Sequence, residues 1–210
     1  WREFKRIEQR PEMYDGKLIA ELNALSFDWN RPFMLSLNPR TGHIPYAKYT
    51  PPELAHFGKG IPKSEYQRYM RGTYDDAMRY FDQIVSEILA IVQQRTSNPT
   101  VVIITSDHGQ RLGESTGYGH NTLEFGSARV PFVYIGLNTP HAVDAMAREL
   151  NCPVTHYDAG RFIAQLLGYR VRSASEVENT YFINGIDLTG RGGYLRYTRA
   201  EALEGQSCSQ

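Results

Sequence analysis

The stretch TVVIITSDHG, residues 100–109, decides the fold that the sequence predicts. Its first six residues are apolar or β-branched and do not alternate, which is typical of a strand covered by helices on both faces. Asp107 and His108 follow directly, and Gly109 allows the backbone to turn sharply after them. In open α/β sheets, ligands bind beyond the carboxyl ends of the strands. We therefore expect Asp107 and His108 to lie in a ligand site at the end of a central strand.

Helical and strand-like segments alternate on both sides of this stretch. Apolar periodicity predicts helices over residues 18–25, 64–94, 141–150 and 158–167. The second of these helices is expected to begin at a capping box with Ser64 as the N-cap. Strands are expected at residues 33–37, 130–135, 181–183 and 194–197. This order predicts an α/β sandwich with a mostly parallel central sheet flanked by helices.

The composition is that of an ordinary globular protein. The 210 residues are enough for one domain, and 23 basic residues balance 23 acidic ones, which argues against nucleic acid as a partner. No apolar run is long enough to span a bilayer, and the chain opens without methionine, which indicates processing or a longer parent. The two cysteines, Cys152 and Cys208, form either one bridge or two free thiols.

Two further histidines fall in loops that follow strand-like or glycine-rich segments. His43 comes after the strand expected at residues 33–37, and His120 ends a Gly-Tyr-Gly-His loop downstream of Asp107. An isolated Asp-His-Gly is more typical of a structural turn, but three histidines and an aspartate at one sheet edge favour a metal or phosphate site. A carboxylate and an imidazole suit Zn²⁺ or a similar divalent ion.

These segments resemble the signature of the phosphoethanolamine transferases that modify lipid A. The segment TSDHGQRLGE is similar to that family's TSDHGESLGE, and the segment GHIPY is similar to its SHGPxY loop. The segment YGH is similar to its histidine-glycine loop, and VP to the strand that follows. Lipoteichoic acid synthases, phosphoglycerol transferases and sulfatases share a looser version. The resemblance covers about residues 30–170, with residues 171–210 as a C-terminal tail. It implies that residues 1–210 are one C-terminal portion of an alkaline-phosphatase-superfamily, sulfatase-like catalytic domain whose N-terminal part is missing.

The resemblance also implies the roles of the site residues. Asp107 and His108 would bind the main catalytic zinc, with manganese or calcium as alternatives. His43 and His120 would bind the transferred phosphate group or a second metal, and His120 would help to protonate a leaving group. The implied reaction moves a phosphoethanolamine-type head group from a phospholipid donor to an envelope lipid or glycan. The parent protein would be membrane-anchored and act on the periplasmic or extracytoplasmic side.

The sequence departs from the family pattern at three points. Gln110 stands where the family has an acid, and Asn121 stands where it has a glycine. The family's nucleophile and first acidic metal ligand lie on an N-terminal segment that is not in this sequence. Neither Thr41 nor Ser106 occupies the nucleophile position, so no nucleophile is assigned, and this portion alone is expected to be inactive.

Two other functions use the same scaffold: a sulfatase or phosphodiesterase-type hydrolase, and a non-catalytic lipid-binding or regulatory module. The presence of all four candidate ligands favours an enzyme. The remaining polar residues are interpreted as structural, with His56 exposed, His141 at a helix start and His156 in a structural hydrogen bond. The acids at positions 75, 76 and 82 are expected on a solvated helix face, with Asp82 as an alternative support of the site.

Overall fold

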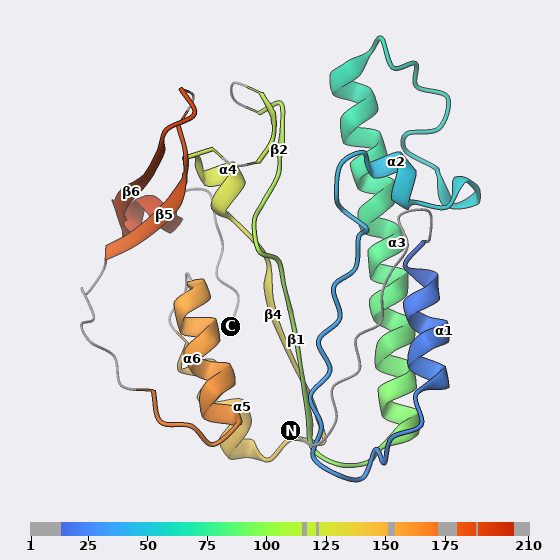
Figure 1. Cartoon of the computed structure of the whole chain (residues 1–210), viewed down its shortest axis with the longest axis vertical. Helices are drawn as coiled ribbons and strands as arrows, with labels where there is room; N and C mark the ends of the chain where they lie inside the picture. Colours follow the sequence, from blue (N-terminus) through green and yellow to red (C-terminus); the bar gives the residue numbers. More distant parts are fainter. Residues whose placement is uncertain are drawn as a thin grey trace. The chain divides into compact units, whose positions relative to one another are not determined.

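A computed structural model describes residues 14–114, 117–120, 122–150, 154–171, 180–187 and 189–203 (Figure 1). The chain divides into two compact units, the first ending at Asn98 and the second beginning at Pro99. Both cysteines, and with them their pairing, lie outside the described residues. Within the described part, no helix is both long enough and apolar enough to cross a bilayer.

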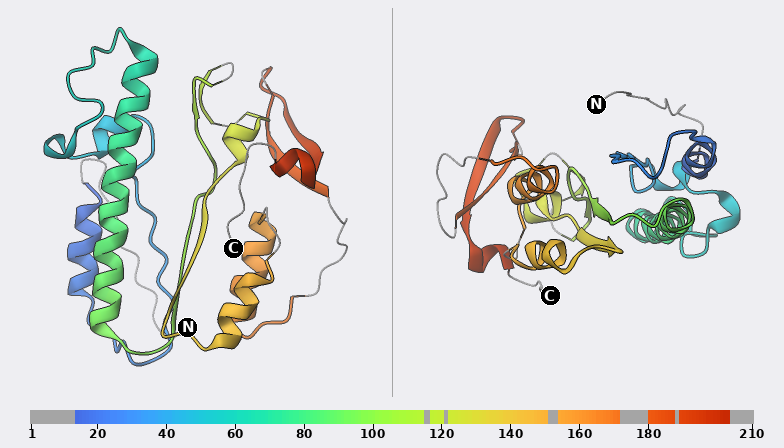
Figure 2. Two further views of the ribbon diagram at one scale, coloured as in Figure 1. Left: turned by 180° about the vertical axis from the view of Figure 1, so that it is seen from behind. Right: turned by 90° about the horizontal axis from the view of Figure 1, so that it is seen from below.

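The first unit is built on the long helix α3, Tyr66–Arg95, as the apolar periodicity predicts. The shorter helix α1, Gly16–Ala24, lies alongside α3 in both views and buries Leu22 (Figures 1 and 2). A hydrogen bond from the Gly16 amide to the Tyr80 hydroxyl, 2.7 Å long, joins the start of α1 to α3. Of the apolar stripe predicted for α3, Ala77, Ile84 and Val92 are buried, so this face of the helix contributes to the core of the unit.

The start of α3 differs from the prediction. Its N-cap is Glu65, no side chain caps the helix, and the capping box predicted at Ser64 is wrong. The Glu65 carboxylate instead accepts a hydrogen bond from Arg68 over 3.0 Å. A capping box needs the cap residue at the last non-helical position. Here the helix begins one residue later than the sequence signature requires.

The segment at residues 33–37, which was expected to be a strand, has no strand conformation. None of the described residues 14–98 belongs to a strand, so this segment has no ladder partner within its own unit. Phe33 packs instead in an aromatic cluster with Phe27 and Trp29, with ring centroids 4.4–5.4 Å apart. The apolar composition of this segment indicates an apolar environment but does not supply the backbone partner that a strand requires.

The loop before α3 contains the short helix α2, Tyr46–Tyr49, and the 3₁₀ helix η1, Pro52–Leu54. Its last part is bound to α3 by Asp76, which is only 2% exposed. The Asp76 carboxylate accepts three hydrogen bonds of 2.7–2.9 Å, from the backbone amides of residues 56–58. The prediction of a solvated face is thus wrong for Asp76, although its neighbour Asp75 is exposed.

The described residues of the second unit form three two-stranded antiparallel sheets. β1, Thr100–Thr105, pairs with β4, Phe132–Leu137; β2, Arg111–Leu112, pairs with β3, Tyr118–Gly119; and β5, Thr180–Ile186, pairs with β6, Gly192–Thr198. The strands predicted near residues 100, 130, 181 and 194 are confirmed, with longer ends in the tail hairpin.

The mostly parallel sheet is not found among the described residues, where the one parallel pairing is an isolated bridge between Thr122 and Ile186. Parallel neighbours need a crossover connection, usually a helix. The stretch between β1 and β4 folds instead as the β2–β3 hairpin and the four-residue helix α4, Phe125–Ala128, and the chain returns antiparallel. The described fold is therefore mixed α/β, with helices and small antiparallel sheets.

Besides α4, the described residues of the second unit form the helices α5, His141–Arg148, α6, His156–Leu166, and α7, Arg199–Leu203. Helix α6 begins at a capping box in which Thr155 and Asp158 bond each other's backbone amides, and it ends before Gly168, whose φ is +82°. Its buried Phe162 contacts Tyr134 of β4, with centroids 6.0 Å apart. This contact places α6 beside the strand pair that carries the Asp-His-Gly turn.

Candidate metal centre

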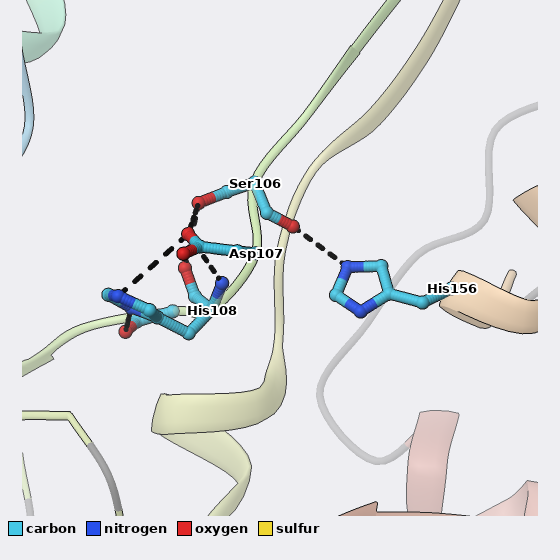
Figure 3. A network of polar contacts seen from close by, with 5 residues as sticks. Ser106, Asp107, His108 and His156 are labelled. Carbon is cyan, nitrogen blue, oxygen red and sulfur yellow. Dashed lines mark hydrogen bonds and ion pairs between the residues drawn. The ribbon is translucent and has the colours of Figure 1, made fainter. Parts of the chain in front are cut away.

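The Asp-His-Gly turn follows β1 directly and is closed by its own polar groups (Figure 3). The His108 amide donates to Asp107 Oδ1 over 3.0 Å. Ser106 Oγ lies 2.9 Å from the His108 carbonyl oxygen, to which it donates, and 3.3 Å from Asp107 Oδ1. Local bonds of this kind are typical of aspartate and serine in turns. They fix the direction of the Asp107 carboxylate relative to the imidazole of His108.

Gly109 holds the turn against helix α4. Its amide donates to the Ser127 carbonyl oxygen over 2.8 Å. A Cβ at this position would collide with the backbone carbonyl oxygens of Gly126 and Arg129. The turn therefore lies directly on the backbone of α4, and only glycine fits there.

Asp107 and His108 each direct one atom that can bind a metal toward the same place. Asp107 Oδ1 lies 3.8 Å from His108 Nε2, and the Asp107 side chain is 86% exposed. His108 Nδ1 lies 2.9 Å from the Gly109 carbonyl oxygen. A carbonyl oxygen only accepts, so Nδ1 carries the proton and Nε2 keeps its lone pair. Histidines that bind metals usually donate their other ring N–H in this way.

The donor pair fits one divalent ion. Zinc bonds to carboxylate oxygen and imidazole nitrogen are about 2.0–2.2 Å long, so two ligands of one ion lie within about 4 Å of each other. The described residues contain no group of three or more His, Cys, Asp or Glu side chains arranged to hold a metal. The arrangement of Asp107 and His108 is therefore that of a partial donor set, which needs further ligands to close it.

His120 lies against His108. The two imidazoles are stacked, with centroids 3.9 Å apart and ring planes 18° apart. His120 follows β3 directly, and the pairing of β3 with β2 returns the chain to the Asp-His-Gly turn. The structure thus brings together three of the four predicted site residues, Asp107, His108 and His120.

His43 belongs to the first unit, so its predicted place at the site stays a prediction. It is exposed, its Nδ1 lies 2.6 Å from the Ile44 carbonyl oxygen, and its ring meets Tyr49 edge-on. As in His108, the bond to a carbonyl oxygen means that Nδ1 of the neutral ring carries the proton.

The loop of His43 is positioned by Asp15, which sequence reasoning missed. Asp15 is 1% exposed, and its carboxylate accepts hydrogen bonds from the amides of Arg40 and Thr41, at 3.0 and 2.6 Å, and from the Thr41 hydroxyl. No local signal marks this role, because its partners lie about 25 residues away in the sequence.

His156 supports the turn from the other side. At the start of α6, its Nε2 lies 2.8 Å from the Ser106 carbonyl oxygen, to which it must donate (Figure 3). This bond agrees with the structural role predicted for His156. Its position was readable in part from the sequence, because Thr155 and Asp158 have capping-box spacing.

Comparison with known proteins identifies the family. A family model described as Sulfatase matches residues 2–169, well over half of the chain. No curated protein and no solved structure matches significantly. Enzymes of the matched family are hydrolases and transferases of the alkaline phosphatase superfamily, and they use divalent metal ions. The carboxylate oxygen and imidazole nitrogen of this pair are atoms of the kind that divalent metals bind. On the family match, the chain belongs to the sulfatase family.

Proposed function

We propose that the protein carries out the metal-dependent transfer of a phosphoethanolamine-type head group from a phospholipid to an envelope lipid or glycan. The observation that supports this most is the donor pair of Asp107 Oδ1 and His108 Nε2, 3.8 Å apart, with His120 stacked on His108. The transferase class is favoured because TSDHGQRLGE resembles the transferase signature more closely than the general sulfatase pattern. The parent would be membrane-anchored, with this region on the periplasmic or extracytoplasmic side.

In this proposal Asp107 and His108 hold the metal, zinc in the first instance, with manganese or calcium as alternatives. When bound there, a divalent ion would supply activation of a hydroxyl nucleophile and would offset the charge that develops on the phosphoryl oxygens. The His108 Nδ1 proton is engaged by the Gly109 carbonyl oxygen, so His108 does not serve as the general acid. His120, with His43, would hold the transferred phosphate group, and His120 would protonate the leaving group.

Gln110 bears on the number of metals. It stands where the transferase pattern has an acid, and its Oε1 is buried without a hydrogen-bond partner among the described residues. An amide oxygen is a hard but neutral donor, so it attracts a cation less than a carboxylate does. We therefore propose that a second metal at this position binds more weakly than in relatives that carry the acid.

The test is metal content and head-group transfer in the full-length protein. Asp107→Ala should remove one equivalent of zinc and abolish transfer from fluorescent phosphatidylethanolamine. Asp75→Ala, which replaces an exposed aspartate on α3, is the matched control and should keep both. Unchanged zinc content in Asp107→Ala would contradict the assignment of the ligand.

The second candidate is hydrolysis of a sulfate ester or phosphodiester, favoured by the family match itself. The same preparation assayed with an aryl sulfate and an aryl phosphodiester separates the two. Hydrolysis without transfer selects the hydrolase, and metal binding without either activity selects a non-catalytic lipid-binding or regulatory module.

A further inference from the structure

Arg111 is a buried cation beside the candidate site. It lies in β2, two residues beyond Gly109, and its side chain is only 9% exposed. A charge is buried at such a place only where partners compensate for the lost water. The transferase signature that the chain resembles has serine at this position, so the arginine is a feature of this chain.

The guanidinium bridges two segments that follow it in the sequence. Its Nη1 lies 3.3 Å from Glu124 Oε2, and its Nη2 donates to the Tyr118 carbonyl oxygen over 3.4 Å. The backbone of Arg111 pairs with Gly119, one residue before His120. A planar fork of this kind holds two acceptors in fixed relative positions, which a single ammonium cannot do.

The stem of Arg111 packs where α4 begins. A Cβ added at Gly126 would lie 3.3 Å from Arg111 Cγ, and one added at Gly117 would lie 3.5 Å from Nη1. Glu124 is the N-cap residue of α4, and α4 is the helix on which Gly109 rests. One side chain therefore contacts both the strand that precedes His120 and the helix that supports His108.

We propose that Arg111 is a positioning residue that holds the ring of His120 against the ring of His108. The inference rests on the proposed function for its purpose, because a fixed His120 is what a transferred phosphate group or a leaving group needs. The claim itself can be tested without measuring activity: the stacking of the two rings depends on the contacts of the Arg111 guanidinium with Glu124 and with Tyr118.

The test uses Arg111→Lys, which keeps the charge and most of the stem, and Glu124→Gln, which keeps the shape of the partner but removes its charge. The full chain with isotope-labelled histidine is examined by NMR for the Overhauser contact between the two imidazoles. Titration with Co²⁺ gives the metal affinity. Arg148→Lys, an exposed arginine at the end of α5, is the control and should change neither.

We expect a folded protein that has lost the contact between the rings in at least one of the two variants. The same variant should bind Co²⁺ about 10- to 100-fold more weakly, because His108, a proposed ligand, loses the ring that it is stacked on, and removal of groups that orient metal ligands typically has this effect. An intact contact and unchanged Co²⁺ affinity in both variants overturn the inference. That result leaves the proposed function standing, whereas full-length wild-type protein with stacked rings that binds no metal would overturn the proposed function alone.

Discussion

Replacement of Asp76 by asparagine tests whether the loop before α3 is held by one buried carboxylate. Oδ1 of Asp76 accepts from the amides of His56 and Phe57, and Oδ2 accepts from the amide of Gly58. Asparagine has one oxygen and one NH₂ group at these positions. Whichever way the asparagine amide is oriented, at least one backbone N–H of the loop therefore faces its NH₂ group, which is itself a donor.

The magnitude follows from these three bonds. A buried donor left without a partner costs about 1–3 kcal/mol, and a hydrogen bond to a charged acceptor is worth about 1 kcal/mol more than a neutral one. One lost bond and two weakened ones predict that Asp76→Asn lowers the free energy of unfolding by about 3–5 kcal/mol. Whole domains are stable by only about 5–15 kcal/mol, so this is a large effect.

Asp75→Asn is the matched control, because Asp75 is exposed on the same helix and should change stability by less than about 0.5 kcal/mol. Urea unfolding followed by tryptophan fluorescence reports on this unit, since Trp29 is buried in it. Hydrogen exchange of the amides at residues 56–58 should accelerate in Asp76→Asn alone. Equal urea midpoints for the two variants would refute the role assigned to Asp76.

Two further predictions concern the second unit. Gly109→Ala should lower the free energy of unfolding by about 2–4 kcal/mol, because the added Cβ collides with backbone atoms and strains or breaks the hydrogen bond to α4. Gly160→Ala within α6 is the control: a Cβ there meets no other atom, so this variant should be neutral or more stable by up to about 1 kcal/mol. Equal melting temperatures for the two variants would contradict the close approach of Gly109 to α4. The hydroxyl of Thr139, 2.7 Å from Asp144, lowers the pKa of that carboxyl. A carboxyl whose folded pKa is lowered contributes stability above its unfolded pKa of about 3.9 and loses it as the pH falls through the folded pKa. Stability should therefore drop less steeply below about pH 4 in Asp144→Asn than in the wild type, as measured by urea midpoints across that range.

The elements that the sequence predicted well are those whose cause is local. The apolar stripe of α3 and the unbroken β-branched run of β1 specify their conformation within a few turns or residues. The Asp-His-Gly turn is local as well, because its closing bonds join Ser106, Asp107 and His108 to one another. For this reason the position of Asp107 and His108 after a strand could be predicted from the sequence, while their role as metal ligands stays a prediction.

The predictions that failed concern residues whose structure depends on partners outside their own segment. Residues 33–37 have strand-like composition, but a strand exists only where a partner backbone lies beside it. Asp75 and Asp76 are alike in sequence, and what separates them is the loop at residues 56–58, some 20 residues upstream, which meets only one of them. Asp15 and Arg111 were missed for the same reason, since their roles are defined by distant acceptors and donors rather than by any neighbouring pattern.

A common physical principle connects these residues to the site. The candidate ligands lie on segments without regular structure, which ladder or helix bonds cannot hold. Each such segment is instead bound to a helix or strand by a bond to its backbone: Asp15 holds the loop of His43, His156 and α4 hold the Asp-His-Gly turn, and Arg111 holds the strand before His120. Fixing a ligand before the metal arrives avoids the entropic cost of ordering it at binding. Substitutions at these supports should therefore weaken metal binding even though none of these groups is itself assigned as a ligand.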